Sequence, residues 1–141
     1  MKIKIKKLHP DAILPRYAHG SEGDAGMDLF AISYTNVLYT ATLIPTGIAI
    51  ELPAGYYAKV CSRSGLALKG IVVVNSPGII DPSYRGEIKV MLASRSFEAV
   101  RIDSGDRIAQ LVISRYEPVE WEEAELSESE RGEGGFGSSG K

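Results

Sequence analysis

The sequence has little of several features that mark particular classes of protein. It contains one cysteine, Cys61, in 141 residues, which excludes a disulfide within the chain and indicates a reducing compartment. No stretch approaches the roughly 20 apolar residues of a membrane-spanning helix. Residues 1–7 alternate lysine with isoleucine and lack the continuous apolar run of a signal peptide. We therefore expect a soluble, intracellular, cytoplasmic protein with no membrane partner.

An excess of positive charge is also missing. The formal net charge is −2, so the molecule as a whole has no positive field for duplex nucleic acid, and we expect no nucleic-acid partner. The two histidines, His9 and His19, show no metal-ligand spacing with each other or with Cys61. The sequence therefore indicates neither a zinc site nor a Ser/His/Asp or Cys/His nucleophile. Any anionic ligand has to be bound by local arginines, lysines and backbone amides.

Short runs of β-forming residues, separated by turn formers, occupy most of the chain. The first run alternates Ile3 and Ile5 with lysines, as a half-buried strand does. The predicted strands are residues 2–8, 27–33, 37–40, 47–52, 56–61, 71–74, 87–93, 97–102 and 107–116. A helical turn or two is expected only at residues 64–69. This pattern predicts an all-β fold, a jelly-roll-like β-sandwich or barrel with one short helix.

The composition changes after Trp121. Residues 122–141 are first acidic and polar, then mostly glycine and serine. Such a segment cannot bury enough apolar area to offset its ordering entropy, so we expect it to be flexible when no ligand is bound. A disordered tail is the simpler interpretation, but Phe136, an aromatic residue between glycines, favours an arm that folds over a ligand. We divide the chain into a β-sandwich catalytic domain, residues 1–121, and an acidic linker with a Gly-rich C-terminal arm, residues 122–141.

Three segments carry residue types suited to phosphate or acid–base chemistry. Residues 63–69 combine an arginine, a hydroxyl and the amide-rich start of a helix, which suit a phosphate, although a capped surface turn fits equally well. Asp81 follows an apolar Ile-Ile pair, where partial desolvation would help a carboxylate act as a base. The alternative for Asp81 is a turn-initiating aspartate before proline. Asp24 and Asp28 lie in a glycine-rich approach to a strand, where aspartates are more often turn residues than metal ligands.

Together these segments resemble the five ordered motifs of the trimeric dUTPase family, over nearly the whole chain. The motifs here are Asp24-Ala-Gly-Met-Asp-Leu29, Arg63-Ser-Gly-Leu-Ala-Leu-Lys69, Gly78-Ile-Ile-Asp-Pro-Ser-Tyr-Arg-Gly-Glu87, Gly105-Asp-Arg-Ile-Ala-Gln-Leu111 and Arg131-Gly-Glu-Gly-Gly-Phe-Gly-Ser-Ser-Gly140. Each motif alone is a weak pattern, whereas five in this order are specific. The resemblance implies a jelly-roll homotrimer that hydrolyses dUTP to dUMP and pyrophosphate, with active sites shared between subunits and closed by the C-terminal arm.

The resemblance also implies a role for each matching residue. Asp81 would activate the water that attacks the α-phosphorus, and Tyr84 would pack against the deoxyribose and exclude a 2′-hydroxyl. Asp28 would contact, through water, a Mg²⁺ ion held mainly by phosphate oxygens. The other implied substrate-binding residues are Asn75 and the backbone near Ile79, Ile80 and Lys89 for uracil; Arg63, Ser64, Gly65 and Gln110 for phosphates; and, from the arm, Arg131, Gly137, Ser138 and Ser139 for phosphates, with Phe136 stacked on the base.

Two short segments depart from the family pattern. Cys61-Ser62 stands where the second motif usually has Ala-Pro, and Lys69-Gly70 is one residue shorter than the usual Lys-His-Gly. Neither change removes a residue with an implied chemical role. The shorter segment makes the alignment of Asn75 weaker than that of Asp81.

Two other functions stay open. A dCTP deaminase resembles this family in fold, but it needs a proton-shuttling carboxylate at the base and has little use for the Gly-rich fifth motif. A catalytically idle module that binds a nucleotide or a protein is the other alternative. The presence of Asp81, Arg131 and Phe136 argues against that module.

Overall fold

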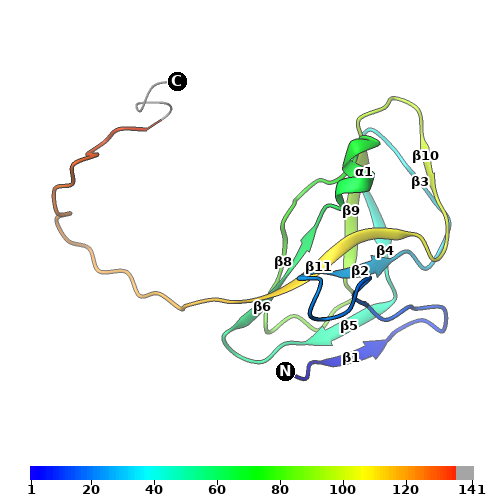
Figure 1. The fold of residues 1–141 in the computed structure, drawn as a ribbon, viewed down its shortest axis with the longest axis horizontal. Helices are drawn as coiled ribbons and strands as arrows, with labels where there is room; N and C mark the ends of the chain where they lie inside the picture. Colours follow the sequence, from blue (N-terminus) through cyan, green and yellow to red (C-terminus); the bar gives the residue numbers. More distant parts are fainter. Residues whose placement is uncertain (136–141) are drawn as a thin grey trace.

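A computed structural model describes residues 1–135 of the chain (Figure 1). Its elements are β1 (Lys4–Lys7), β2 (Met27–Phe30), β3 (Thr35–Val37), β4 (Thr42–Pro45), β5 (Ile48–Glu51), β6 (Tyr56–Cys61), α1 (Ser64–Leu68), β7 (Ile71–Val73), β8 (Gly78–Ile80), β9 (Lys89–Ser94), β10 (Val100–Ile102) and β11 (Arg107–Arg115). The expected all-β fold with one short helix is confirmed. Across these residues, no helix has the length and apolarity that a bilayer crossing requires.

Two antiparallel sheets provide most of the β-sandwich. One has the strand order β2-β11-β6-β8, and the other has the order β4-β9-β7. Two antiparallel pairs, β1-β5 and β3-β10, extend the structure at opposite ends (Figure 1). In the four-stranded sheet, strands that are distant in sequence lie side by side. Segments from the first, second and fourth predicted motifs therefore meet on β2, β11 and β6, and the third motif begins in β8 at the other edge of the sheet.

The core lies between the sheets and follows from the alternation of side chains along each strand. In β9, Val90, Leu92 and Ser94 are buried while the residues between them are more exposed. In β6, Ala58 and Val60 are buried in the same way. Side chains from both sheets join one apolar cluster, which is the arrangement expected of a β-sandwich.

Strand β1 differs from its prediction in burial. All four of its residues are exposed, and Ile5, expected on a buried face, retains 39% of its accessible surface. Within residues 1–135 the strand pairs only with β5, and no second layer covers it completely. Ile3 and Ile5 instead help to line an apolar groove on the surface.

Other differences concern the short strands. A strand predicted at residues 37–40 is wrong: β3 ends at Val37, and the hydroxyl of Thr42 accepts the N–H of Leu38 where a ladder partner would stand. Strands β4 and β8 were missed. β4 ends in Pro45, and β8 has three residues beginning with Gly78, so both resemble turns by composition.

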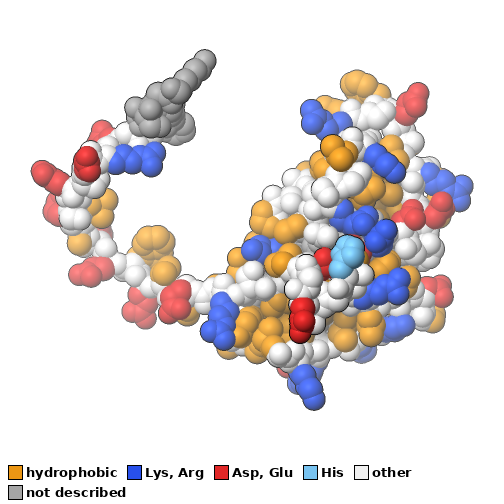
Figure 2. Space-filling model, in the orientation of Figure 1, with side chains coloured by type: hydrophobic (Ala, Val, Ile, Leu, Met, Phe, Trp, Pro, Cys, Tyr) orange, Lys and Arg blue, Asp and Glu red, His pale blue; other side chains and the backbone are white. Residues whose placement is uncertain are grey.

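The segment after β11 leaves the β-sandwich. Residues 115–133 are all exposed, and residues 116–133 form no strand or helix. In the single chain the segment extends away from the sheets (Figure 1), and its charged side chains are mostly acidic (Figure 2).

Candidate active site

Residues of the third motif line a cavity of about 480 Å³ at the surface of the β-sandwich. Its walls are Leu43, Ile79, Ile80, Asp81, Tyr84, Glu87 and Lys89. The fold therefore brings together the predicted base, the predicted sugar-contacting tyrosine and three of the predicted uracil-contacting positions.

A tight turn places Asp81 and Tyr84 on one loop. Strand β8 pairs with β6 and ends just before Asp81. Pro82 follows and has no N–H with which to continue the ladder. The N–H of Tyr84 then donates to the carbonyl of Asp81, at 3.1 Å. The loop projects both side chains toward the cavity.

The cavity is open in the single chain. The carboxylate of Asp81 is exposed rather than partly desolvated, because side chains alternate along β8 and Ile79 faces outward. Ile79 is 53% exposed and Tyr84 is 44% exposed. These two side chains form an accessible wall against which a flat ring or a sugar can pack.

Asn75 is not among the residues that line this cavity. It belongs to the connection between β7 and β8, and its side-chain amide lies against Gly78. A Cβ added at Gly78 would stand 2.9 Å from Nδ2 of Asn75. Glycine at position 78 therefore allows the amide to approach the first residue of β8.

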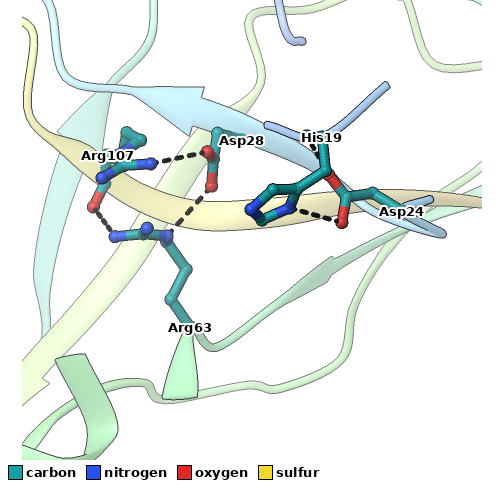
Figure 3. A network of polar contacts seen from close by, with 5 residues as sticks. All are labelled: His19, Asp24, Asp28, Arg63 and Arg107. Carbon is teal, nitrogen blue, oxygen red and sulfur yellow. Dashed lines mark hydrogen bonds and ion pairs between the residues drawn. The ribbon is translucent and has the colours of Figure 1, made fainter. Parts of the chain in front are cut away.

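The first, second and fourth motifs meet on the four-stranded sheet. Asp28 of β2 is opposite Gln110 of β11, and Gln110 is opposite Cys61 of β6. Arg63 follows Cys61 by two positions and reaches back over the sheet (Figure 3). A Cβ added at Gly26 would contact Gln110 at 3.3 Å, so the glycine of the first motif makes room for this side chain.

Asp28 is the centre of an ion-pair network (Figure 3). The residue is 4% exposed, and its Oδ1 lies 3.0 Å from Nε of Arg63. Its Oδ2 lies 3.5 Å from Nη1 of Arg107, whose carbonyl accepts a hydrogen bond from Nη1 of Arg63 at 3.0 Å. Within the described residues the buried Nε of Arg63 has no aligned hydrogen-bond acceptor, so its contact with Asp28 is an ion pair. Two guanidinium groups and one carboxylate leave an excess of positive charge here.

Ser64 and Gly65 begin α1 directly after Arg63 and are exposed. No atom would lie within 4 Å of a Cβ added at Gly65, so the backbone there is open to a ligand. The expected helix at residues 64–69 is confirmed apart from its last residue. Arg63 is the N-cap and makes no side-chain capping bond, which leaves its guanidinium for the network with Asp28.

A histidine–aspartate pair closes the loop that leads into the first motif (Figure 3). The backbone N–H of His19 donates to Oδ2 of Asp24 at 2.6 Å, and Nδ1 of His19 lies 3.1 Å from Oδ1. These two contacts, the backbone one foremost, hold the pKa of Asp24 below its ordinary value. Asp24 therefore acts as a turn residue, which is the more frequent role of an aspartate in such a segment, and not as a metal ligand.

The described part of the arm, residues 122–135, reaches neither the cavity nor the Asp28 network in the single chain (Figure 1). Arg131 is exposed and its Nε donates to the carbonyl of Gly134 at 2.6 Å. Phe136, Gly137, Ser138 and Ser139 lie outside the described residues. Among residues 1–135, no group of three or more His, Cys, Asp or Glu side chains is placed to hold a metal ion.

Sequence reasoning missed three residues. Leu43 and Glu87 line the cavity, and Arg107 pairs with Asp28. Glu87 ends the third motif and Arg107 lies within the fourth, which was the available signal for these two, whereas Leu43 lies in β4 and outside every motif.

Comparison with known proteins places this geometry in context. The family model described as dUTPase matches residues 13–140. Deoxyuridine 5'-triphosphate nucleotidohydrolase from Solibacter usitatus is 52% identical over 143 residues, covering 100% of this chain and 97% of the relative. The enzyme of the same name from Hydrogenobaculum sp. is 53% identical over 144 residues, covering 99% of each. A solved structure of a mutant dUTPase from Staphylococcus bacteriophage 80alpha with dUpNHpp has a TM-score of 0.88 at 30% identity, covering 99% of each chain.

Proposed function

The chain belongs to the dUTPase family of dUTP-hydrolysing enzymes, and we propose that Asp81 is the general base of its reaction. Asp81 takes a proton from a water molecule, whose oxygen attacks the α-phosphorus of dUTP. The bond from the α-phosphorus to the bridging oxygen breaks, and pyrophosphate leaves with that oxygen while dUMP remains. The support is the position of an exposed carboxylate at the edge of a cavity that Ile79 and Tyr84 also line.

We propose that this cavity binds the nucleoside. Tyr84 presents its ring to the sugar and excludes a 2′-hydroxyl, and the backbone at Ile79, Ile80 and Lys89 reads the polar edge of uracil together with Asn75. Backbone contacts to the polar edge of uracil would leave little space at the 5-position of the base, so a 5-methyl group would clash and dTTP would be rejected.

The phosphates would bind at the phosphate cluster, which is formed on the four-stranded sheet by Asp28, Arg63, Arg107 and Gln110. Arg63 directly precedes the exposed residues Ser64 and Gly65, and Gln110 is opposite Cys61 on the adjacent strand. The two guanidinium groups of the network exceed the single carboxylate in charge. Positioning and charge stabilisation then supply most of the rate enhancement. From the arm, Arg131, Gly137, Ser138 and Ser139 would add phosphate contacts, and Phe136 would stack on the base.

Mg²⁺ is the cofactor expected for this family, and the described residues fit a weakly protein-bound ion. They offer no cluster of three acidic or imidazole ligands, so phosphate oxygens and water would supply most of the coordination, as Mg²⁺ prefers. Both oxygens of Asp28 already face arginines, which leaves a contact through water as the role that fits. When bound, the ion neutralises charge on the triphosphate.

We propose that the active enzyme is a homotrimer with shared sites. The cavity lining includes none of the residues Asp28, Arg63, Gln110 or Arg107, so the nucleoside and phosphate clusters occupy different parts of one chain. A site that holds a whole nucleotide is then completed by a neighbouring chain. The exposed apolar groove beside β1 supports association, because contact with another subunit would remove it from water.

Product analysis on two substrates tests the proposal. The protein should release pyrophosphate and dUMP from dUTP and leave dCTP intact. Release of ammonia from dCTP would indicate the deaminase alternative, and inertness toward both nucleotides would indicate the idle binding module.

A further inference from the structure

We infer that Gly86 and Glu87 hold the ring of Tyr84 in the orientation that selects deoxyribose, an inference that rests on the sugar-selecting role proposed for Tyr84. Neither residue is proposed to contact the sugar. Both act as positioning residues: Gly86 leaves space for the ring of Tyr84, and the carbonyl of Glu87 accepts its hydroxyl.

The first observation is steric. The Tyr84 ring lies across the backbone of Gly86 so closely that a Cβ added there would stand 2.5 Å from Cζ and would also overlap the hydroxyl oxygen. Real Cβ atoms essentially never approach other heavy atoms that closely. The backbone of Gly86 is not in the left-handed region that favours glycine. Glycine is therefore needed at position 86 for the tyrosine ring.

The second observation is a hydrogen bond that fixes the outer end of the same ring. The hydroxyl of Tyr84 donates to the carbonyl of Glu87 at 2.9 Å. With the turn bond from the N–H of Tyr84 to the carbonyl of Asp81, the residue is held at its backbone and at its hydroxyl. An exposed tyrosine without such a bond would sample several rotamers.

The carbonyl of Glu87 is itself fixed to the core. The carboxylate of Glu87 accepts the N–H of Gly47 at 2.8 Å. The next residue, Ile88, is fully buried, and its N–H donates to the carbonyl of Ile48 at 2.8 Å. The hydroxyl of Thr46 donates to the carbonyl of Ile88. Two bonds to the turn between β4 and β5 and one to the first residue of β5 therefore anchor the segment to which Tyr84 is attached.

A methyl group at position 86 is expected to move Tyr84 rather than unfold the protein. The overlapping atoms are the far end of a side chain at the surface, which can rotate away without moving the backbone. Rotation breaks the bond to Glu87 and removes the wall that excludes a 2′-hydroxyl.

The test is a double-mutant cycle on sugar selectivity, measured as kcat/KM for dUTP divided by kcat/KM for UTP. Tyr84→Ala and Gly86→Ala should each lower this ratio by about tenfold or more. In the Tyr84→Ala background, Gly86→Ala should have no further effect. Thermal unfolding of each variant should match the parent enzyme.

The outcomes separate the inference from its premise. If Tyr84→Ala lowers the ratio and Gly86→Ala does not, the inference is wrong while the role of Tyr84 stands. An equal effect of Gly86→Ala with and without Tyr84 also overturns it. If Tyr84→Ala leaves the ratio unchanged, the premise itself fails.

A second pair of variants covers the case in which Gly86→Ala does not fold. Glu87→Ala removes the acceptor of the Gly47 N–H, whereas the amide oxygen of Glu87→Gln can still accept it. The alanine variant should lower the selectivity ratio and the glutamine variant should retain it. Equal ratios in the two variants would show that the anchor does not control Tyr84.

Discussion

Asp28 shows at the scale of one residue how a buried charge can serve a binding site. A carboxylate that is 4% exposed is expensive to desolvate unless it is paired. Here Arg63 and Arg107 pair with its two oxygens from different motifs. The carboxylate thereby holds two guanidinium groups close together that would otherwise repel each other.

Asp28→Asn should weaken both folding and phosphate binding. The amide keeps the shape but loses the charge, so the arginines face each other without a counter-ion. Because solvent still reaches the side chains of Arg63 and Arg107 and screens their repulsion, the unfolding free energy should fall by only about 1–3 kcal/mol. Urea unfolding measures this loss, and KM for dUTP should rise because Arg63 is no longer held.

Asp103→Asn is the matched control for that variant. Asp103 pairs with Arg101 at 2.6 Å, but both side chains are more than half exposed. An exposed pair typically contributes less than about 1 kcal/mol, and neither residue has a proposed role in the site. Similar unfolding energies for the two variants would contradict the importance assigned to the Asp28 network.

Asp81→Asn should nearly abolish turnover while dUTP binding is retained. The amide fits the same space but cannot take a proton from water, and loss of a general base typically costs about 10²–10⁴-fold. Single-turnover rates should fall by this factor while the Kd of a non-hydrolysable dUTP analogue changes little. A variant with near-normal turnover would assign the base to another group.

Residues within continuous motifs could be placed from the sequence, whereas partners from distant segments could not. Asp81 and Tyr84 are in one loop, and the structure brings them to one cavity. The carboxylate of Glu87 contacts the N–H of Gly47, 40 positions away, and the guanidinium of Arg107 contacts Asp28, 79 positions away. Those contacts depend on strand pairing, which no local pattern specified.

At the scale of elements, strong alternation gave reliable boundaries. Strand β6 was predicted at residues 56–61 and lies there, because its valine and tyrosines have high strand propensity and its inward positions are apolar. Strands β4 and β8 were missed because proline and glycine at their ends also form turns. The exposure of β1 could not be foreseen, because its lysine–isoleucine pattern is the same whether its own chain or a neighbour covers the apolar face.

Removal of residues 131–141 tests the arm as an element. The truncated protein should keep the thermal stability of the full chain, because residues 115–133 are exposed and contribute little to the core. Its kcat/KM for dUTP should nevertheless fall steeply, since closure would supply phosphate contacts and exclude water. Equal kcat/KM values for the two proteins would reduce the arm to a tail without function.

At the scale of the whole molecule, the separation of the two clusters is the main consequence of the fold. The cavity belongs to the loop after β8, whereas the phosphate cluster lies on β2, β11 and the end of β6. A small β-sandwich also exposes an apolar groove that a neighbouring subunit could cover. Both features favour an oligomer in which one chain supplies the base and another supplies the phosphate ligands.

Mixed oligomers of two inactive variants show whether one active site draws residues from two chains. Asp81→Asn lacks the proposed base and Arg63→Ala lacks a proposed phosphate ligand, so each variant alone should hydrolyse dUTP at a small fraction of the parent rate. After unfolding and refolding together, some sites should combine Asp81 from one chain with Arg63 from another. Hydrolysis of dUTP should therefore reappear in the mixture and not in either variant refolded alone. Mixed oligomers that form, by native mass spectrometry, but remain inactive would show that each site lies within one chain, and would contradict the account.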